Sequence, residues 1–584
     1  MSEKTYIKGK DRDLESTIDT MKSKLEAWDI HVKEASELNP VPYVHSVHIK
    51  DAGCPLMFTN GKGASQKASL ASAFGEYFER LSCNYFFADY YLGEAFGEAE
   101  FVHYPNEKWF EIEDEMPEGL LDDGLWDYYD PNQELMPDEI FDTNSGAGER
   151  GICALPFERQ RDGESIYFPV NIIGNIYVSN GMAAGNTKNE ARVQALSEIY
   201  ERYVKNKIIA EGISLPEIPL DVLERFPHIL ESIEALKKEG FGLRICDASL
   251  GGVYPVISVT LINPQDGSVL ASFGAHPCFE VALERTVTEL LQGRSLDQLD
   301  DFFAPSFNLD EVADMNNLEA HFINSTGLIS YEFFKNQADY VFADWNYEGD
   351  TNSEFEYLSA IAHDADFDIY IMDYEHLGVY ACRMIVPGMS DIYSVNDLQW
   401  SNNNEGAQYR EAILSLKNLD DDAIDDLLDE LEDGGYQDLM KVAEFIGIAP
   451  DPGSGWAYLQ IGELKAMLHL AVGEYEEAHE WNNWCLLMNE PYPKRLRYFR
   501  CLNAFLEVIL DESRDIVAYL QSLLEMYGSE NVQVCNDVIQ GKEKFHGLHS
   551  PGLSLEGFEL HNKLLEGYGK LHKAKATFWE RKNG

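Results

Sequence analysis

Residues 59–80 read TNGKGASQKASLASAFGEYFER, a glycine-containing turn followed by a segment rich in Ala and Leu, which are strong helix formers. Ser72, Glu76 and Glu79 lie at positions i, i+4 and i+7 of the expected helix, so their side chains share one face. One such stripe is ordinary on a solvated helix, where charged pairs contribute only about 0.3–0.5 kcal/mol. Two further copies follow glycine-containing turns: Gln194, Glu198 and Glu201 after residues 181–185, and Arg285, Glu289 and Gln292 after residues 274–277.

The three segments together indicate a site that combines anions and cations. Helix N-termini that are reached through glycine turns offer free N–H groups to an anion. Carboxylates gathered opposite them repel each other unless cations lie between them, and hard oxygen ligands suit Mg²⁺. The pattern therefore predicts a nucleoside triphosphate held through Mg²⁺. Gly61-Lys62-Gly63 lacks the spacing of a Walker A loop, so the site is not a P-loop.

Length and composition bound the class of protein. The chain has 584 residues, 45% of them hydrophobic and 12% aromatic, which is enough for two or three packed domains. Its 45 basic and 102 acidic side chains leave a formal net charge of −57. Such a charge disfavours general binding to nucleic acids or anionic membranes, because phosphate binding needs clustered cations. We therefore expect no direct contact with nucleic acid and no membrane association.

The cysteines and the N-terminus indicate a cellular location. Nine cysteines are scattered without a Cys-x-x-Cys pair, which predicts neither a disulfide framework nor a zinc or iron–sulfur site. The first residues contain no apolar signal core, and no run of 18 apolar residues occurs. We expect a cytoplasmic protein.

Periodicity predicts elements that differ between the first two thirds of the chain and the rest. Strands are predicted at residues 44–49, 166–178 and 379–386, with a hairpin formed by residues 253–262 and 269–273. From about residue 400 the patterns are helical. Residues 418–432 predict an acidic amphipathic helix, and residues 462–487 predict a helical hairpin whose Ala466 and Ala478 have the spacing of a tetratricopeptide (TPR) repeat.

Taken together, these motifs resemble those of the YcaO family over residues 60–390. The resemblance rests on Gly61-Lys-Gly63, Ser72-x3-Glu76-x2-Glu79-Arg80, Ser179-Asn-Gly-x-Ala-Ala-Gly185, Glu190-x3-Gln194-x3-Glu198-x2-Glu201-Arg202 and Arg285-x3-Glu289-x2-Gln292. Gly9-Lys10-Asp11 and the acidic C-terminal region are similar to stand-alone members of enterobacterial type. The resemblance implies an α+β fold with an N-terminal segment (1–59) that contributes to the ATP site, a catalytic domain (60–400) that binds ATP and Mg²⁺, and an all-α TPR-like domain (401–584).

The resemblance also implies roles for individual residues in a non-Walker ATP site. Glu76, Glu79, Glu198, Glu201 and Glu289 are carried over as metal-side carboxylates, and the first four are expected to act in catalysis together with Arg285. Lys10, Arg202 and Arg285 are carried over as phosphate contacts. Ser72, Asn186, Glu190 and Gln194 are carried over as nucleotide or supporting contacts, with a hydroxyl from Thr17 or Ser16.

Members of the family activate a peptide amide, whose oxygen attacks ATP and leaves as a phosphorylated or adenylated oxygen. The stand-alone class implies an accessory factor in β-methylthiolation of an aspartate on a small-subunit ribosomal protein, working with a radical-SAM methylthiotransferase. It also implies a homodimer. Azoline-forming members usually end in a Pro-x-Pro-x-Pro tail, whereas this chain ends in residues 578–584 without one.

Other functions remain open from the sequence. The TPR-like helices are also typical of a binding scaffold in which the nucleotide is structural or regulatory. An azoline- or thioamide-forming peptide modifier is a second alternative. A carboxylate-bridged redox metal site is disfavoured, because the three motif helices carry no Glu-x-x-His pair.

Overall fold

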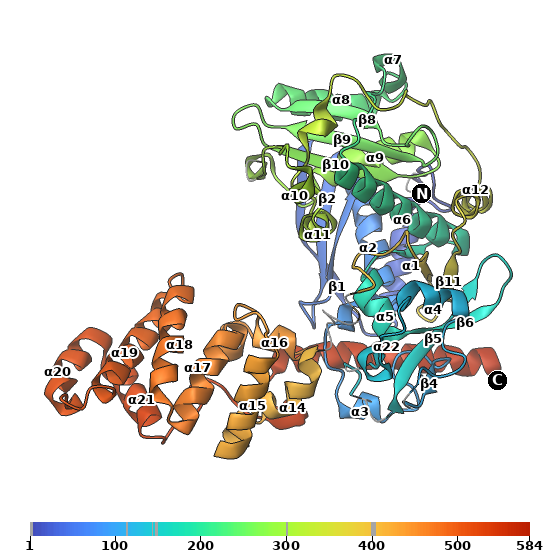
Figure 1. Cartoon of the computed structure of the whole chain (residues 1–584). Coiled ribbons are helices and arrows are strands. Elements are labelled where there is room, and N and C mark those ends of the chain that lie inside the picture. The colour runs from blue at the N-terminus through green and yellow to red at the C-terminus, as the bar shows by residue number, and fades with distance from the viewer. Residues whose placement is uncertain are drawn as a thin grey trace.

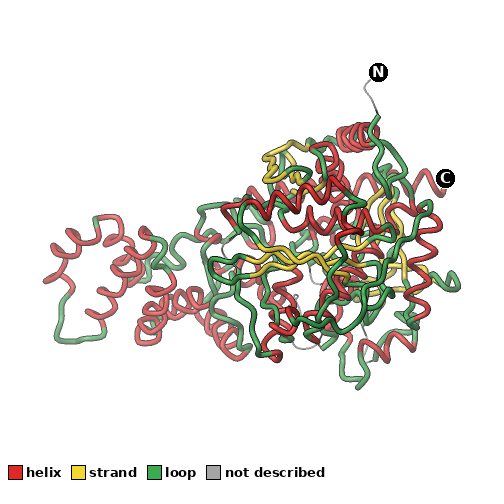
Figure 2. Tube along the Cα trace, turned by 90° about the horizontal axis from the view of Figure 1, so that it is seen from above, coloured by secondary structure: helices red, strands yellow, loops and turns green. Residues whose placement is uncertain are grey.

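The computed structural model describes residues 4–112, 115–142, 144–146, 150–299, 302–396, 398 and 405–584. Figure 1 shows a mixed α+β body from which an all-helical arm projects, and the last helix returns from the arm to run along the body. Seen from above, the strands lie within the body with helices around them, and the arm contains helices and loops (Figure 2). The predicted α+β class with a helical C-terminal part is confirmed.

The strands form three antiparallel sheets within the described residues. The first sheet has the order β1 (Val32–Val41), β2 (Val44–Asp51), β3 (Phe58–Gly63). The second has the order β10 (Val269–Ala275), β9 (Val256–Ile262), β8 (Gly242–Asp247). The third has the order β4 (Lys108–Phe110), β5 (Ile152–Arg159), β11 (Tyr370–Tyr374), β12 (Tyr380–Ile385), β7 (Met182–Gly185), and β6 (Ser165–Pro169) pairs with β5.

Three long helices carry the polar motifs: α2 (Gln66–Ser82), α6 (Lys188–Glu211) and α9 (Phe279–Leu290). Ser65 and Thr187 cap α2 and α6, because their hydroxyls accept hydrogen bonds from the N–H groups of Ala68 and Glu190. The body also contains α1 (Leu14–Glu26), α3 (Glu94–Gly97), α4 (Asp123–Tyr129), α5 (Val170–Ile172), α7 (Leu220–Leu223), α8 (Pro227–Lys238), α10 (Leu309–Val312), α11 (Met315–Ile323) and α12 (Thr351–Asp364).

The arm and the returning helix make up the C-terminal part. The arm consists of α14 (Arg410–Leu414), α15 (Asp421–Asp433), α16 (Val442–Phe445), α17 (Ile461–Val472), α18 (Tyr475–Met488), α19 (Pro493–Ile509), α20 (Ile516–Tyr527) and α21 (Ser529–Ile539), and α22 (Glu559–Asn583) returns to the body. The predicted helices at 418–432 and 462–487 are confirmed, and their relation to TPR repeats stays a prediction. The predicted domain boundary at 400–401 lies outside the described residues.

Of the glycines before the three motif helices, Gly181 lies in a turn and has a φ of +76°, whereas the others do not form the turns that the sequence predicted. They lie at the ends of β3, β7 and β10, and each strand packs directly against the helix that follows it. A Cβ on Gly61 would lie 2.0 Å from the carbonyl oxygen of Ser69, and one on Gly185 would lie 2.6 Å from the nitrogen of Ala191. These glycines therefore permit close contact between strand and helix, and side chains of Ser65 and Thr187 cap α2 and α6, whereas α9 has no side-chain cap.

Two strand predictions have different outcomes. The hairpin is confirmed, with β9 and β10 paired from Val256 opposite Ala275 to Ile262 opposite Val269. The strand predicted for residues 166–178 is wrong beyond Pro169, where the chain turns into α5 and a π-helix over Ile173–Tyr177. A continuous apolar run fits a buried helix as well as a strand, so its pattern alone could not separate the two.

Helix α22 is part of the core of the body although it lies at the end of the chain. Leu564, Tyr568 and Leu571 are fully buried in one cluster with Phe74 and Tyr77 of α2. The hydroxyl of Tyr568 also donates a hydrogen bond to the backbone carbonyl of Val102. The body therefore depends on a helix that is separated from it in sequence by the whole arm.

All nine cysteines are buried and free, as expected for a chain without a disulfide framework. Within the described part of the chain, none of the helices combines the length and the apolar character that a bilayer crossing requires.

We predict that Tyr568→Ala destabilises the body by about 3–5 kcal/mol, because it leaves a cavity in the α2–α22 core. Tyr568→Phe should cost only about 1 kcal/mol, the effect of the lost hydrogen bond. Urea denaturation followed by circular dichroism measures both, with the exposed Tyr519→Ala on α20 as a control that should leave the midpoint unchanged. Equal midpoints for Tyr568→Ala and the wild type would contradict this account of α22.

Candidate functional site

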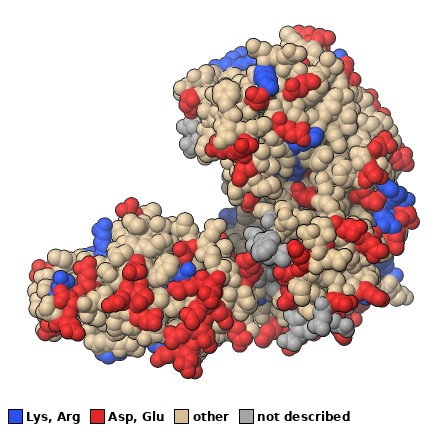
Figure 3. Space-filling view, viewed as in Figure 1, with Lys and Arg blue, Asp and Glu red and all other residues tan. Residues whose placement is uncertain are grey.

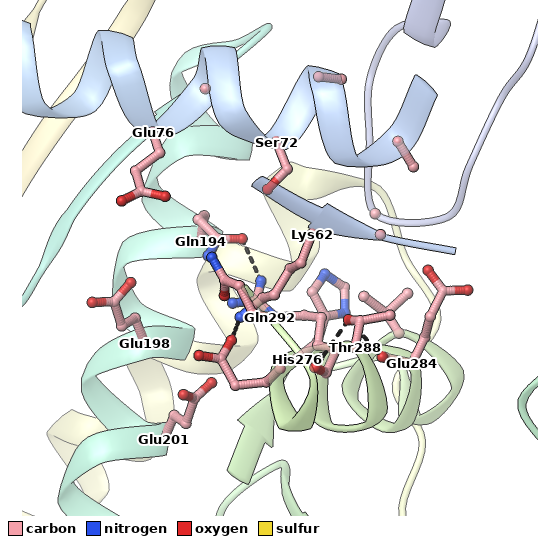
Figure 4. A pocket seen from close by; sticks show the side chains of 18 of the residues that line it. Lys62, Ser72, Glu76, Gln194, Glu198, Glu201, His276, Glu284, Thr288 and Gln292 are labelled. Atoms are coloured by element: carbon pink, nitrogen blue, oxygen red, sulfur yellow. Dashed lines mark hydrogen bonds and ion pairs between the residues drawn. The ribbon is translucent and has the colours of Figure 1, made fainter. Parts of the chain in front are cut away.

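A cavity of about 880 Å³ lies between α2, α6, α9 and the N-terminal segment 6–17. The predicted site residues all line it, with Thr17 rather than Ser16: Lys10, Thr17, Ser72, Glu76, Glu79, Asn186, Glu190, Gln194, Glu198, Glu201, Arg202, Arg285 and Glu289. Figure 4 shows Ser72 and Glu76 on one helix facing Gln194, Glu198 and Glu201 on the next, with Thr288 on a third, and Gln292 lies just beyond the end of that third helix. Segments far apart in the sequence therefore converge on one space.

The α2 side of the cavity holds two carboxylates and one guanidinium. Arg80 lies 3.5 Å from Oε1 of both Glu76 and Glu79. Burial raises the pKa of Glu79 well above its ordinary value, which Arg80 opposes and the neighbouring carboxylates of Glu198 and Glu76 reinforce. Burial also raises the pKa of Glu76. The charged forms of both acids are therefore disfavoured in the cavity unless cations lie beside them.

The α6 side repeats this arrangement. Arg202 lies 3.1 Å from Oε1 of Glu198, one turn earlier on the same helix. The charge of Glu198 contributes to the raised pKa values of Glu76 and Glu79. Carboxylates of α2 and α6 therefore lie close together across the cavity. Glu201 follows on the same face of α6 (Figure 4).

Helix α9 supplies a guanidinium and a third carboxylate. Arg285 donates to the side-chain oxygen of Gln194 on α6, while its Nε is buried without a hydrogen-bond partner among the described residues. Glu289 forms an ion pair with Lys62 of β3. Gln292 Nε2 donates to the backbone carbonyl of Asn60 at 2.7 Å, which fixes the end of α9 against β3. A guanidinium with an unused N–H is suited to a phosphate oxygen.

The N-terminal segment crosses the cavity and is tied to α6. Glu190 accepts a hydrogen bond from the backbone N–H of Asp11 at 2.9 Å and lies 3.5 Å from Lys10 Nζ. Thr17 donates to the side-chain oxygen of Asn186 at 2.9 Å, and Asn186 donates to Glu190 at 3.1 Å. The predicted contribution of the N-terminus to the site therefore has a direct physical basis.

Three residues of the cavity were missed as functional residues by the sequence analysis: Lys62, Lys205 and His276. Burial lowers the pKa of Lys62 to about 8 and that of Lys205 to about 7. Lys205 follows Glu201 by four residues, so it extends the α6 stripe by one turn, and this spacing could have revealed it. The position of Lys62 between two glycines was a weaker signal.

His276 lies in the predicted turn 274–277, and the structure buries it in the wall of the cavity. Its Nδ1 accepts a hydrogen bond from the N–H of Cys278, so the proton of the neutral ring is on Nε2. Burial, together with the cations Arg285 and Lys10, lowers its pKa to about 3. A Cβ on Gly9 would lie 2.8 Å from Nε2 of His276, and Gly9 has a φ of +71°. Only glycine therefore fits where the N-terminal segment 6–17 passes His276.

The donor set fits a hard divalent cation bound together with an anion. The acidic side chains supply oxygen atoms, which Mg²⁺ prefers, and the cations between them match the charge of a phosphate chain. In the described residues, no three His, Cys, Asp or Glu side chains are already grouped closely enough to hold an ion. The carboxylates instead pair with Arg80, Arg202 and Lys62, so binding of a metal would exchange these partners.

Two family models together match most of the chain. Residues 60–390 match the family model described as YcaO cyclodehydratase, ATP- and Mg²⁺-binding, and residues 406–577 match that of the YcaO cyclodehydratase C-terminal domain. Among solved structures, a YcaO protein of Methanopyrus kandleri, bound with AMPPCP and Mg²⁺, is 17% identical, with a TM-score of 0.43 over 69% of this chain and 97% of that chain.

Two full-length relatives are much closer in sequence. The ribosomal protein S12 methylthiotransferase accessory factor YcaO of Escherichia coli is 54% identical over 98% of this chain and 99% of its own length. An uncharacterised protein of Haemophilus influenzae is also 54% identical, over 99% of this chain and all of its own length. With both family models matched and these relatives covered from end to end, the chain belongs to the YcaO family of ATP- and Mg²⁺-binding proteins.

Proposed function

We propose that this protein is an ATP- and Mg²⁺-dependent accessory factor in the β-methylthiolation of an aspartate on a small-subunit ribosomal protein. The observation that carries the proposal is the convergence of carboxylates and cations from α2, α6 and α9 on one cavity. The named target class comes from the relative in Escherichia coli, with which this chain shares 54% identity. A radical-SAM methylthiotransferase would be the partner enzyme, since that relative is named as the accessory factor of a methylthiotransferase.

The residues divide into two groups by charge. Glu76, Glu79, Glu198, Glu201 and Glu289 would hold Mg²⁺, while Lys10, Arg202 and Arg285 would hold phosphate oxygens. When bound, magnesium–ATP supplies an electrophilic phosphorus for an amide or acyl oxygen of the substrate. Arg285 is positioned on α9 by Gln194, so its charge is available without a large rearrangement where negative charge develops.

The strap formed by residues 6–17 would exclude water from the nucleotide. Glu190 and Asn186 hold it in place, and His276 packs against Gly9 from the opposite wall. A neutral His276 with its proton on Nε2 can donate to the nucleotide or to the strap without adding charge. Whether ATP is split to ADP or to AMP depends on the phosphorus that is attacked, and product analysis decides it.

A scaffold function is the second candidate. The arm exposes Val517, Tyr519 and Met526 on α20, and acidic side chains gather over the arm around α15 (Figure 3). Such a surface suits docking of a protein or a second subunit, including the predicted homodimer. Tight nucleotide binding without ADP or AMP formation would favour this scaffold function over catalysis.

We predict that Glu76→Gln and Glu201→Gln each lower Mg²⁺-dependent ATP turnover by about a hundredfold or more, because each removes a charged oxygen from the metal side. Turnover is measured by chromatographic separation of ATP, ADP and AMP. Glu356→Gln, an exposed substitution on α12, is the matched control and should keep wild-type turnover. Full activity in both site variants, with circular dichroism unchanged, would overturn the assignment.

We also predict that Mg²⁺ binding releases protons. The raised pKa values of Glu76 and Glu79 mean that these carboxyls retain protons above the ordinary value of about 4.5, and the metal needs both ionised. Mg²⁺ affinity should therefore fall as the pH falls through these raised values.

The test is titration calorimetry of the nucleotide-free protein with Mg²⁺ at pH 6 in two buffers of different ionisation enthalpy. Glu79→Gln should reduce the number of protons released. Identical heats in the two buffers would contradict the prediction.

A further inference from the structure

A second cavity, of about 650 Å³, lies where the body, the arm and α22 meet. Its lining includes Cys83 and Asn84 at the end of α2, the π-helix Ile173–Tyr177, Gly447 of the arm and Tyr568 of α22. This volume is in the range of small-molecule sites, and such sites are frequent at domain interfaces. Neither the predicted ATP site nor the proposed function uses it.

The two cavities are neighbours but distinct. Arg80 lines the ATP cavity, and its guanidinium lies over the ring of Tyr85 at 4.5 Å from the centroid. Tyr85 in turn lines the second cavity. This pair of side chains therefore separates the two spaces at the C-terminal end of α2.

The lining of the second cavity is mainly aromatic and apolar, and one buried cation interrupts it. Arg383 of β12 is 5% exposed and lines the cavity. Its Nη2 donates to the backbone carbonyls of Ile173 at 3.3 Å and of Val178, and its Nη1 lies 3.7 Å from the sulfur of Met182. Its Nε is buried with no hydrogen-bond partner.

Among the described residues, every partner of Arg383 is therefore neutral. Burying a guanidinium without a carboxylate is costly, and natural structures usually pair such a charge. Asp142, the buried acid of the lining, already pairs with His103 and accepts a hydrogen bond from the N–H of Ser145 at 3.2 Å. The other acids of the lining, Asp89 and Glu444, are exposed.

We propose that the second cavity binds a carboxylate with an aromatic or apolar body, and that Arg383 pairs with the carboxylate. Tyr104, Tyr374 and Tyr568 line the space for the body of the ligand, and Arg383, whose partners are all neutral, is the cation of the lining for its charged end. The ligand is either a free small acid or the C-terminal residue of a peptide, since both present the same chemistry.

Two variants of the full-length protein test this site independently. Gly174 of the π-helix lines the cavity and a Cβ there would meet no atom within 4 Å, so we expect Gly174→Leu to narrow the cavity, and Gly174→Ala is its matched control. Arg383→Gln removes the charge while keeping a donor for the carbonyls around it. Thermal unfolding verifies that each variant is folded. If Arg383→Gln does not fold, Gly174→Leu alone tests the proposal.

Binding is measured by titration calorimetry with N-acetyl-phenylalanine and with its primary amide, which lacks the charge. The acid should bind about tenfold or more tightly than the amide. Gly174→Leu and Arg383→Gln should abolish this difference, and Gly174→Ala should keep it. The same titration is made with acetyl-Gly-Gly-Phe, with a free or an amidated C-terminus. If the free tripeptide binds more tightly than N-acetyl-phenylalanine, the ligand is a peptide C-terminus, and if it binds less tightly, the ligand is a free acid.

Three results would overturn the proposal: equal binding of acid and amide, unchanged binding to Gly174→Leu, or displacement of the acid by magnesium–ATP. The last would place the acid in the ATP cavity.

Discussion

Carboxylates from α2, α6 and α9 meet around one cavity, and the free energy of this arrangement depends on the cations between them. In the structure, Arg80 and Arg202 each lie beside a carboxylate of their own helix, and Lys62 reaches across from β3 to Glu289. Burial and the neighbouring carboxylates of Glu198 and Glu76 raise the pKa of Glu79, and Arg80 opposes that rise. A divalent cation would relieve the remaining repulsion and free the arginines for phosphate oxygens, so metal and nucleotide should reinforce each other's binding.

That cavity exists only because strands and helices approach closely. Gly61, Gly185 and Gly274 each lie where a Cβ would overlap an atom of the following helix. Any side chain there would push the helix away from its strand and turn its polar face out of the cavity. The glycines of the motifs thus act through packing, and the polar residues act through charge. Both recur together three times because each polar helix face is directed into the cavity only when a glycine lets its helix approach the strand.

Much of the site was predictable, because helical spacing alone placed Glu76 beside Glu79 and Glu198 beside Glu201. The family resemblance supplied Lys10, which lies outside the three motif helices, and the role of Arg285 as a phosphate contact. The role of the glycines was predicted wrongly, since a glycine before a helix fits a turn and a strand end equally well. The burial of Lys205 and His276 depends on neighbours distant in sequence, and the return of α22 to α2 depends on contacts nearly 500 residues apart, which periodicity cannot reveal.

The arm is linked to the body at both of its ends, because α22 follows the arm in the chain and packs in the core of the body. Lys575 of α22 is buried, and its Nζ donates to the side-chain oxygen of Asn84 and, at 2.8 Å, to the carbonyl of His103. Asn84 follows Cys83, the C-cap of α2, the helix that carries Glu76 and Glu79. A displacement of the arm that shifts α22 would therefore act on the end of this helix before any other element of the ATP cavity. Since the second cavity lies at the same junction, a ligand or a docked protein there would act on α2 through the same contacts.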